Sequence, residues 1–511
     1  MLRSVFSLAL ITAALTGLSA SAHAQGKGLD AVETIVVIYA ENRSFDNLYG
    51  NFPGANGLQN VKPADAIQLD RDGTPLKELP PVWGNLTGKG VTPVVTQAQT
   101  EHLPNKPFAI DDPNGFNTSI GVVTHDLWHL FYQNQMQIDG GKNDKFVAYA
   151  DSGALVMGHY DGAKLPMWNI AKKYTLADNF FMAAFGGSFL NHFWLICACA
   201  PKYPDADKSP AKDKIAVVEP DGASLELAAN SPPSALDGIP KFPRDGTLTP
   251  DFYAVNTMQP PYQPSANPPA EGGDPALADP ALPTTLPPQH EETIGDLLSA
   301  KKISWAWYSG AWRATLDGQN AKPVPNFQYH HQPFNYFADM APGTAARAAH
   351  LRDGGLGGVL FLEAIDAGAL PPVTFYKPQG NLNEHAGYAA VLAGDKHIAD
   401  VIAHLQKSPQ WAHMLVIVTY DENGGFWDHV APPKGDRWGP GMRVPTIIVS
   451  PYAKRRTVDH TQYDTTSILR FITERFALPV LPGIAARDQA LRDHGSKPMG
   501  DLTGALDLSR P

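Results

Sequence analysis

Continuous apolar runs alternate along the chain with stretches of helical periodicity. Five runs have the length and composition of buried strands: Thr34–Ala40, Ser304–Tyr308, Val373–Tyr376, Met414–Tyr420 and Thr446–Ser450. Apolar residues recur at helical spacing in Asp395–Gln406 and Thr465–Phe476. Strands that are apolar on both faces are typical of a largely parallel sheet covered by helices. The pattern therefore predicts an α/β sandwich.

One long segment departs from this alternation. Residues 201–290 contain 19 of the 46 prolines and few periodic runs. Such a composition favours turns over strands or helices, so we predict a loop-rich insertion and not a second core. The mature chain, residues 25–511, is accordingly predicted to form a single domain that carries this insertion.

The N-terminus has the features of an export signal. Arg3 precedes the apolar run Val5–Leu18, and Ala22–Ala24 fits a small-x-small cleavage site. The run is shorter than the ~20 residues that a transmembrane helix needs, and no later segment is suitable. We therefore predict a Sec-type signal peptide over residues 1–24, cleavage after Ala24, and a periplasmic or secreted protein.

Composition narrows the function classes. The 511 residues carry a net charge of −11, which argues against nucleic acid or an anionic membrane surface as the main partner. Only 2 cysteines are present, which excludes a disulfide-rich scaffold. Because Cys197 and Cys199 lie two residues apart in an expected helix, where side chains diverge, we predict no bridge between them.

Acidic and amide residues directly follow two of the predicted strands. Glu41 and Asn42 come after the first strand, and Asp421 and Glu422 come after Met414–Tyr420. Ligands bind at the carboxyl ends of strands in such sheets, and buried carboxylates are costly unless a cation neutralises them. Their oxygens suit Mg²⁺, Mn²⁺ or Ca²⁺, and an added imidazole would admit Zn²⁺. Alternatively, the acids merely cap the next loop or helix, the commoner role for either one alone.

Ser188 follows two glycines at the start of an apolar stretch with the character of a helix. Free N–H groups at a helix start favour a phosphate or an oxyanion, and a metal ion could activate the serine as a nucleophile. An ordinary N-cap serine is the alternative, and it is preferred for this residue taken alone. The surrounding sequence is neither G-x-S-x-G nor a phosphate-binding P-loop.

Histidines supply a further set of candidates. His125 and His129 are four residues apart and share a face if their segment is helical. His330 and His331 are adjacent, and His385 follows the strand Val373–Tyr376. Imidazoles can hold phosphoryl oxygens or protonate a leaving group, although most of the 17 histidines are expected to be structural or exposed.

Taken together and in order, these stretches resemble the family of bacterial acid phosphatases and phosphatidylcholine-type phospholipases C. The matching segments are ENRSFDNLYG (41–50), HLFYQNQMQIDGGKNDKF (129–146), FGGSFLNHFWL (185–195), FQYHHQPFNYF (327–337) and YDENGGFWDHVAPP (420–433). The likeness extends from residue 31 to about residue 480. It implies an alkaline-phosphatase-like sandwich with a central, mostly parallel sheet.

The resemblance also implies a role for each candidate residue. The ligands of one divalent metal ion, with Mg, Mn, Ca or Zn all possible, would be Glu41, Asn42, Ser188, Asp421 and Glu422. Ser188 would also be the nucleophile. His129, His385 and one of His330 and His331 would surround the phosphate, and we expect His129 and His385 to be catalytic. His125 lies outside the matching segments and is a further candidate for binding the substrate. Asp428 and His429 would have a supporting role.

Two departures from the family pattern favour its acid phosphatase branch. Phospholipase members usually have threonine where this chain has Ser188, and they tend to carry further C-terminal domains and a twin-arginine signal. We therefore predict a metal-dependent acid phosphatase that hydrolyses small phosphate monoesters through a phosphoserine. The alternatives are a phospholipase C that acts on phosphatidylcholine-type phospholipids and, from another class, a periplasmic phosphate-binding protein without turnover.

Overall fold

The computed structural model describes residues 27–319 and 327–509. The predicted signal peptide, residues 1–24, lies outside the described residues. Among the helices of the described ranges, none has both the length and the apolar character needed to cross a bilayer.

An eight-stranded sheet forms the centre of the molecule, in the order β11-β4-β10-β9-β1-β8-β6-β7. The strands of this sheet are β1 (Thr34–Ala40), β4 (Thr175–Ala177), β6 (Trp305–Gly310), β7 (Leu351–Gly355), β8 (Val373–Lys377), β9 (Met414–Tyr420), β10 (Thr446–Val449) and β11 (Thr457–Asp459). β10 runs antiparallel to both of its neighbours, and the other neighbouring pairs are parallel. Two small pairs lie apart from this sheet: β2 (Phe108–Ala109) with β3 (Gly158–His159), and β5 (Phe180–Phe181) with β12 (Tyr463–Asp464).

The five predicted strands occupy the five contiguous central positions of the sheet, from β10 to β6. Each of them is buried along its length, which is why their sequences are apolar without alternation. The pattern missed the two edge strands, β11 and β7, and also β4, which lies beside β11. β4 and β11 have only three residues each, and the sequence of β7 is LRDGG, with polar and glycine positions.

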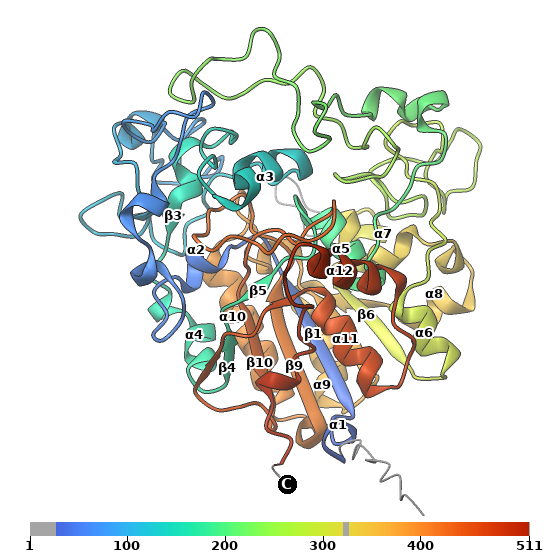
Figure 1. Cartoon of the computed structure of the whole chain (residues 1–511). Helices are drawn as coiled ribbons and strands as arrows, with labels where there is room; N and C mark the ends of the chain where they lie inside the picture. Colours follow the sequence, from blue (N-terminus) through green and yellow to red (C-terminus); the bar gives the residue numbers. More distant parts are fainter. Residues whose placement is uncertain (1–26, 320–326, 510–511) are drawn as a thin grey trace, which may run out of the picture.

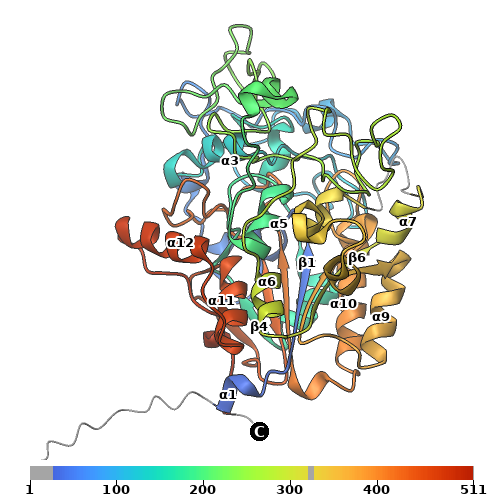
Figure 2. The same ribbon diagram turned by 90° about the vertical axis from the view of Figure 1, so that its right-hand side faces the viewer.

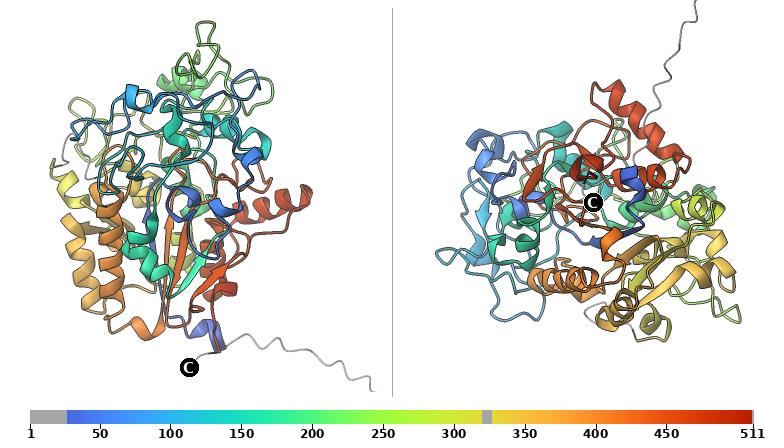
Figure 3. Two further views of the ribbon diagram at one scale, coloured as in Figure 1. Left: turned by 90° about the vertical axis from the view of Figure 1, so that its left-hand side faces the viewer. Right: turned by 90° about the horizontal axis from the view of Figure 1, so that it is seen from below.

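Helices cover both faces of the sheet. The α-helices are α1 (Lys27–Asp30), α2 (Phe45–Tyr49), α3 (Phe131–Ile138), α4 (Pro166–Ala171), α5 (Ser188–Cys197), α6 (Ile294–Ala300), α7 (Trp312–Leu316), α8 (Ala345–His350), α9 (Val359–Asp366), α10 (Val391–Leu405), α11 (Thr466–Arg475) and α12 (Pro482–Asp493). Figure 2 shows α9 and α10 on one side of the sheet and α5, α6 and α11 on the other, and the view from below in Figure 3 agrees. The predicted α/β sandwich is confirmed.

Irregular segments lie beyond the carboxyl ends of the central strands. Residues 51–130 and 201–290 arch over this end of the sheet, in blue to cyan and in green in Figure 1. All of residues 201–290 are described, and they contain two short 3-10 turns and isolated bridges but no α-helix or strand. These segments therefore lie on the side of the sheet where the acidic strand ends emerge.

The prediction that Cys197 and Cys199 do not pair is wrong, because the two residues form a disulfide. α5 ends at Cys197, and Ala198 adopts the left-handed conformation, with φ 49° and ψ 42°. The chain therefore turns back at once and brings the two Cα atoms to 5.1 Å. The prediction assumed that both cysteines lie in one helix, but the helix ends at Cys197 and Cys199 lies beyond it.

Candidate active site

The register of β1 and β9 brings the two acidic strand ends together. Ala40 pairs with Tyr420, so Glu41 and Asp421 emerge side by side from adjacent parallel strands. Asn42 has a left-handed backbone, with φ 60°, and its N–H donates to Asp421 Oδ1 at 3.1 Å. All of these side chains are buried, as is Glu422. The four residues thus form one cluster at the carboxyl edge of the sheet.

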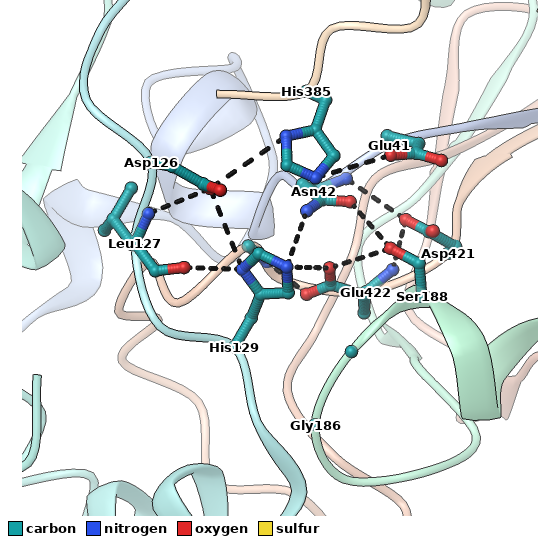
Figure 4. Close-up of polar contacts among 12 residues, drawn as sticks. Glu41, Asn42, Asp126, Leu127, His129, Gly186, Ser188, His385, Asp421 and Glu422 are labelled. Carbon is teal, nitrogen blue, oxygen red and sulfur yellow. Dashed lines mark hydrogen bonds and ion pairs between the residues drawn. The ribbon is translucent and has the colours of Figure 1, made fainter. Parts of the chain in front are cut away.

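Ser188 is the first residue of α5, and its side chain points into this cluster (Figure 4). Its Oγ lies 3.2 Å from Asn42 Oδ1 and 3.3 Å from Glu422 Oε1, either of which can accept its one hydrogen. The N-cap position is taken by Gly187, which has no side chain to cap the helix. The alternative of an ordinary N-cap serine therefore does not describe Ser188, because its hydroxyl is engaged by the acidic cluster.

A glycine directly upstream makes this placement of the helix start possible. Gly186 has φ 85°, a conformation that side-chain-bearing residues rarely adopt. A Cβ on Gly186 would also lie 2.5 Å from the backbone nitrogen of Phe131, at the start of α3. The two glycines before Ser188 therefore allow the start of α5 to approach the start of α3 closely.

Glu41 is held ionised by basic groups. Lys377, the last residue of β8, places its Nζ 2.8 Å from Glu41 Oε1, and His331 Nε2 contacts the same oxygen. Burial alone would raise the pKa of Glu41, but the interactions with His331 and Lys377 outweigh it and hold that pKa well below its usual value. Glu41 is thus an anchored carboxylate and does not cap a loop.

Without a further cation, the buried site disfavours the ionised forms of Asp421 and Glu422. Burial raises the pKa of Asp421 to about 6, although Lys377 opposes this shift. Burial, and then the charge of Asp421, raise the pKa of Glu422 well above its usual value. Asp421 Oδ2 makes no hydrogen bond, although it is buried.

These observations fit a divalent cation. Three buried carboxylates face each other with one lysine among them, and a cation would relieve the desolvation and repulsion that raise the two pKa values. The available donors are carboxylate, amide and hydroxyl oxygens, which hard divalent ions prefer. Ligand atoms of Glu41, His192 and Asp421 also lie within 4.8 Å of one another. The five residues predicted as metal ligands are therefore brought together with a donor set suited to such an ion.

A cavity of about 290 Å³ opens beside Ser188. Its walls are formed by Asp126, His129, Leu130, Gly187, Ser188, Phe189, Val255, Asn256, Thr257, Gln328, His330, His385 and Tyr388. Val255, Asn256 and Thr257 belong to the proline-rich segment 201–290, so that segment contributes directly to the cavity wall. Most of the lining side chains are polar or charged.

Two histidines of the cavity wall, His129 and His385, lie edge to face, with ring centroids 5.5 Å apart. Nδ1 of His129 donates to Leu127 O at 2.6 Å, and Nδ1 of His385 donates to the carbonyl of Ala386. Each ring therefore keeps its other nitrogen, Nε2, for the site (Figure 4). Nε2 of His129 accepts from the Asn42 amide at 3.4 Å, and Nε2 of His385 lies 3.7 Å from Glu41 Oε2.

The remaining histidine candidates, His330, His331 and His125, lie in three different places. His330 lines the cavity, whereas His331 is 1% exposed and contacts Glu41 behind it. Burial lowers the pKa of both rings, that of His331 to about 4. The helix expected over His125 and His129 is absent, because α3 begins only at Phe131, and the ring of His125 lies beside Gly84 and not in the cavity wall.

Asp428 and His429 belong to a neighbouring ion-pair network. Arg443 Nε donates to Asp428 Oδ1 at 2.9 Å, and His429 Nδ1 contacts Asp46 Oδ2 at 2.6 Å. Burial opposes the charge on His429, but Asp46 overrides it and raises the pKa of that ring. The network joins the residues after β1 to those after β9. A supporting role of Asp428 and His429 in the reaction stays a prediction.

Sequence reasoning missed three residues of the site. Lys377 ends β8, so the rule that singled out polar residues after buried strands would have found it. His192 lies four residues after Ser188 on the same helix, donates from Nδ1 to Ser188 O at 2.7 Å and is fully buried. Asp126 Oδ1 lies 3.9 Å from Nδ1 of both His129 and His385. No periodicity marks Asp126, which lies in a loop.

Comparisons with known proteins are consistent with this geometry. The chain is 24% identical to phospholipase C A of Mycobacterium tuberculosis over 515 residues, which cover 94% of this chain and 78% of that protein. It is 23% identical to non-hemolytic phospholipase C of Pseudomonas aeruginosa over 531 residues, or 97% of this chain and 60% of that protein.

Solved structures are more distant. A protein of the alkaline phosphatase superfamily from Vibrio parahaemolyticus matches 71% of this chain and 67% of its own chain, with a TM-score of 0.32 and 9% identity. A TM-score of 0.32 is too low to support a fold assignment. The fold is assigned from the strand order of the central sheet. The sequence profile of the Phosphoesterase family, in contrast, matches residues 32–479, which include every residue of the cluster and the cavity. The chain therefore belongs to the Phosphoesterase family, whose members are hydrolases of phosphoric ester bonds.

Proposed function

We propose that this phosphoesterase transfers the phosphoryl group of its substrate to Ser188 and then releases it to water. The observation that carries the proposal is the position of the Ser188 hydroxyl. It lines the cavity, lies within hydrogen-bond distance of Asn42 and Glu422, and serves no capping role. A buried serine in such a cluster is typical of an activated nucleophile.

The proposed metal ligands are Glu41, Asn42, Ser188, Asp421 and Glu422. When bound, a divalent ion would supply positive charge that favours the ionised form of a nearby hydroxyl. The chain itself provides an acceptor for the Ser188 proton, since Glu422 Oε1 lies 3.3 Å from Oγ. The ionised oxygen would then attack phosphorus, form a phosphoserine and displace the alcohol of the ester.

The leaving alcohol requires a proton, and His385 and His129 are the candidates to donate it. Both present Nε2 toward the cavity because their Nδ1 atoms are fixed by carbonyl oxygens. Nε2 of a protonated ring would give its proton to the departing oxygen and would then take one from the water that hydrolyses the phosphoserine. Free N–H groups at the start of α5 would stabilise the charge that develops on the phosphoryl oxygens.

Small phosphate monoesters are the substrates that we favour, acted on at mildly acidic pH. The cavity has a volume of about 290 Å³, and most of its lining side chains are polar or charged, which suits a small charged ester better than two acyl chains. The serine at the nucleophile position supports the same branch of the family. A second candidate is a phospholipase C activity, which the two phospholipases similar to this chain over most of its length support.

A substrate comparison separates these two candidates. We expect kcat/KM for a soluble aryl phosphate to exceed that for phosphatidylcholine vesicles by at least about tenfold, because the volume and the lining side chains of the cavity suit the small ester better. Release of inorganic phosphate and of phosphocholine would be measured with the same metal-loaded sample. Faster release of phosphocholine from the vesicles would favour the phospholipase C. Turnover of either substrate would exclude a phosphate-binding protein without activity.

We also propose that the protein acts outside the cytoplasm. The features of a signal peptide over residues 1–24 support this location, and so does the disulfide between Cys197 and Cys199, since such bonds persist in oxidising compartments. N-terminal sequencing of the protein purified from a cell fraction should begin at Gln25. An intact Met1 in a cytoplasmic fraction would contradict export.

A further inference from the structure

Lys377 is a buried cation placed between two carboxylates of the cluster. Its Nζ lies 2.8 Å from Glu41 Oε1 and 3.7 Å from Asp421 Oδ2, and its side chain is fully buried. It also lies over the ring of Tyr39, 5.1 Å from the centroid. Lys377 is not part of the cavity wall, so it does not face the substrate. Its two ion pairs are with residues that would hold the metal ion, and its Nζ also lies 3.5 Å from the carbonyl oxygen of Ala40.

The same space could otherwise hold a cation. Ligand atoms of Glu41, His192 and Asp421 lie within 4.8 Å of one another, and so do those of Glu41, His330 and His331. Nε2 of His192 is buried and has no hydrogen-bond partner. A second divalent ion in this space would find carboxylate and imidazole ligands, a combination that suits Zn²⁺.

The charges of the cluster explain why a lysine is placed there. Glu41, Asp421 and Glu422 can supply three negative charges, and Lys377 supplies one positive charge. The difference of two matches a single divalent ion. An ammonium in direct contact with Glu41 Oε1 would strongly repel another ion bound to that oxygen, because both charges are removed from water.

We propose that the ammonium of Lys377 takes the place of a second cation, so that the site binds one divalent ion per chain. This inference rests on the metal ligands assigned in the proposed function. Lys377 is a positioning residue: it holds the Oε1 side of Glu41 and leaves the oxygens of Asn42, Ser188 and Glu422 to the single ion.

The ion count of the unaltered protein tests the proposal first. The protein would be dialysed to equilibrium against Mn²⁺ or Zn²⁺, and the metal per chain would be measured by plasma mass spectrometry. We expect one tightly bound ion with either metal. Two ions per chain would overturn the role of Lys377 and leave the nucleophile Ser188 unaffected. No bound ion would instead contradict the metal assignment of the proposed function.

Replacement of Lys377 tests whether its ammonium excludes a second ion. Lys377→Ala should bind two Zn²⁺ ions per chain, because space and charge become available beside Glu41 and His192. Lys377→Arg keeps the charge and should still bind one. Lys172→Ala, which removes an exposed lysine over Trp168 on α4, is the matched control and should also bind one. A folded Lys377→Ala protein with one ion and an unchanged Kd would overturn the proposal. If that variant does not fold, the counts for the unaltered protein and Lys377→Arg decide.

Discussion

Replacing Ser188 by alanine should lower kcat by roughly 10³-fold or more, because the nucleophile of the proposed double displacement is removed. The hydroxyl makes hydrogen bonds only within the acidic cluster and does not cap the helix, whose N-cap residue is Gly187, so α5 should remain intact. Turnover of a soluble aryl phosphate with saturating metal is the measurement. Binding of inorganic phosphate by the variant shows that the cavity has survived.

A second buried serine provides the control for this substitution. Ser408 lies beyond the end of α10, away from the cavity, and its Oγ donates to Ile365 O at 2.8 Å. Ser408→Ala should keep its turnover near that of the unaltered enzyme, although it loses a buried hydrogen bond. If Ser188→Ala also keeps most of its turnover, Ser188 is not the nucleophile and water attacks the substrate directly.

Removal of the divalent ion should stop turnover and destabilise the fold, and its return should reverse both effects. Without the ion, Asp421 and Glu422 are ionised at a cost, as their raised pKa values indicate. An ion present at about 100 times its Kd would add about 2.7 kcal/mol to the free energy of unfolding. Activity and Tm would be followed after chelation and after addition of Mg²⁺, Mn²⁺, Ca²⁺ or Zn²⁺.

The sign of the pH dependence follows from the same residues. The folded-state pKa of Asp421, about 6, lies above the unfolded value of about 3.9. Such a group favours folding at low pH, and its contribution is lost as the pH rises through the folded-state value. The Tm of the metal-free protein should therefore fall between about pH 4 and pH 6 and level off above, and added ion should raise it most at the upper end. A chelated protein with full activity and an unchanged Tm would contradict the metal site.

The central sheet and half of the site could be predicted because they obey one rule. Buried central strands are apolar throughout, and polar residues that interrupt the apolar pattern at their carboxyl ends converge, as Glu41 and Asp421 do. The edge strands were missed because a strand with one neighbour is short and needs no continuous apolar run, as β7 shows. Lys377 follows the same rule as Glu41 and was overlooked only because a basic residue was not sought there.

Other features depend on backbone conformations that the residue pattern does not encode. A single left-handed residue, Ala198, ends α5 and allows the disulfide that helical geometry would forbid. His125 and His129 have the spacing of a helix face but lie in an extended segment before α3. The choice between His330 and His331 depends on a short turn, which points one ring to the cavity and the other to Glu41.

The most direct test of the double displacement is to trap the covalent intermediate. The metal-loaded enzyme would be mixed with a soluble aryl phosphate, quenched in acid during turnover, digested and examined by mass spectrometry. We predict a phosphoryl group on Ser188, absent from the Ser188→Ala protein and from enzyme quenched without substrate. Steady turnover with no phosphorylated Ser188 peptide would contradict the account.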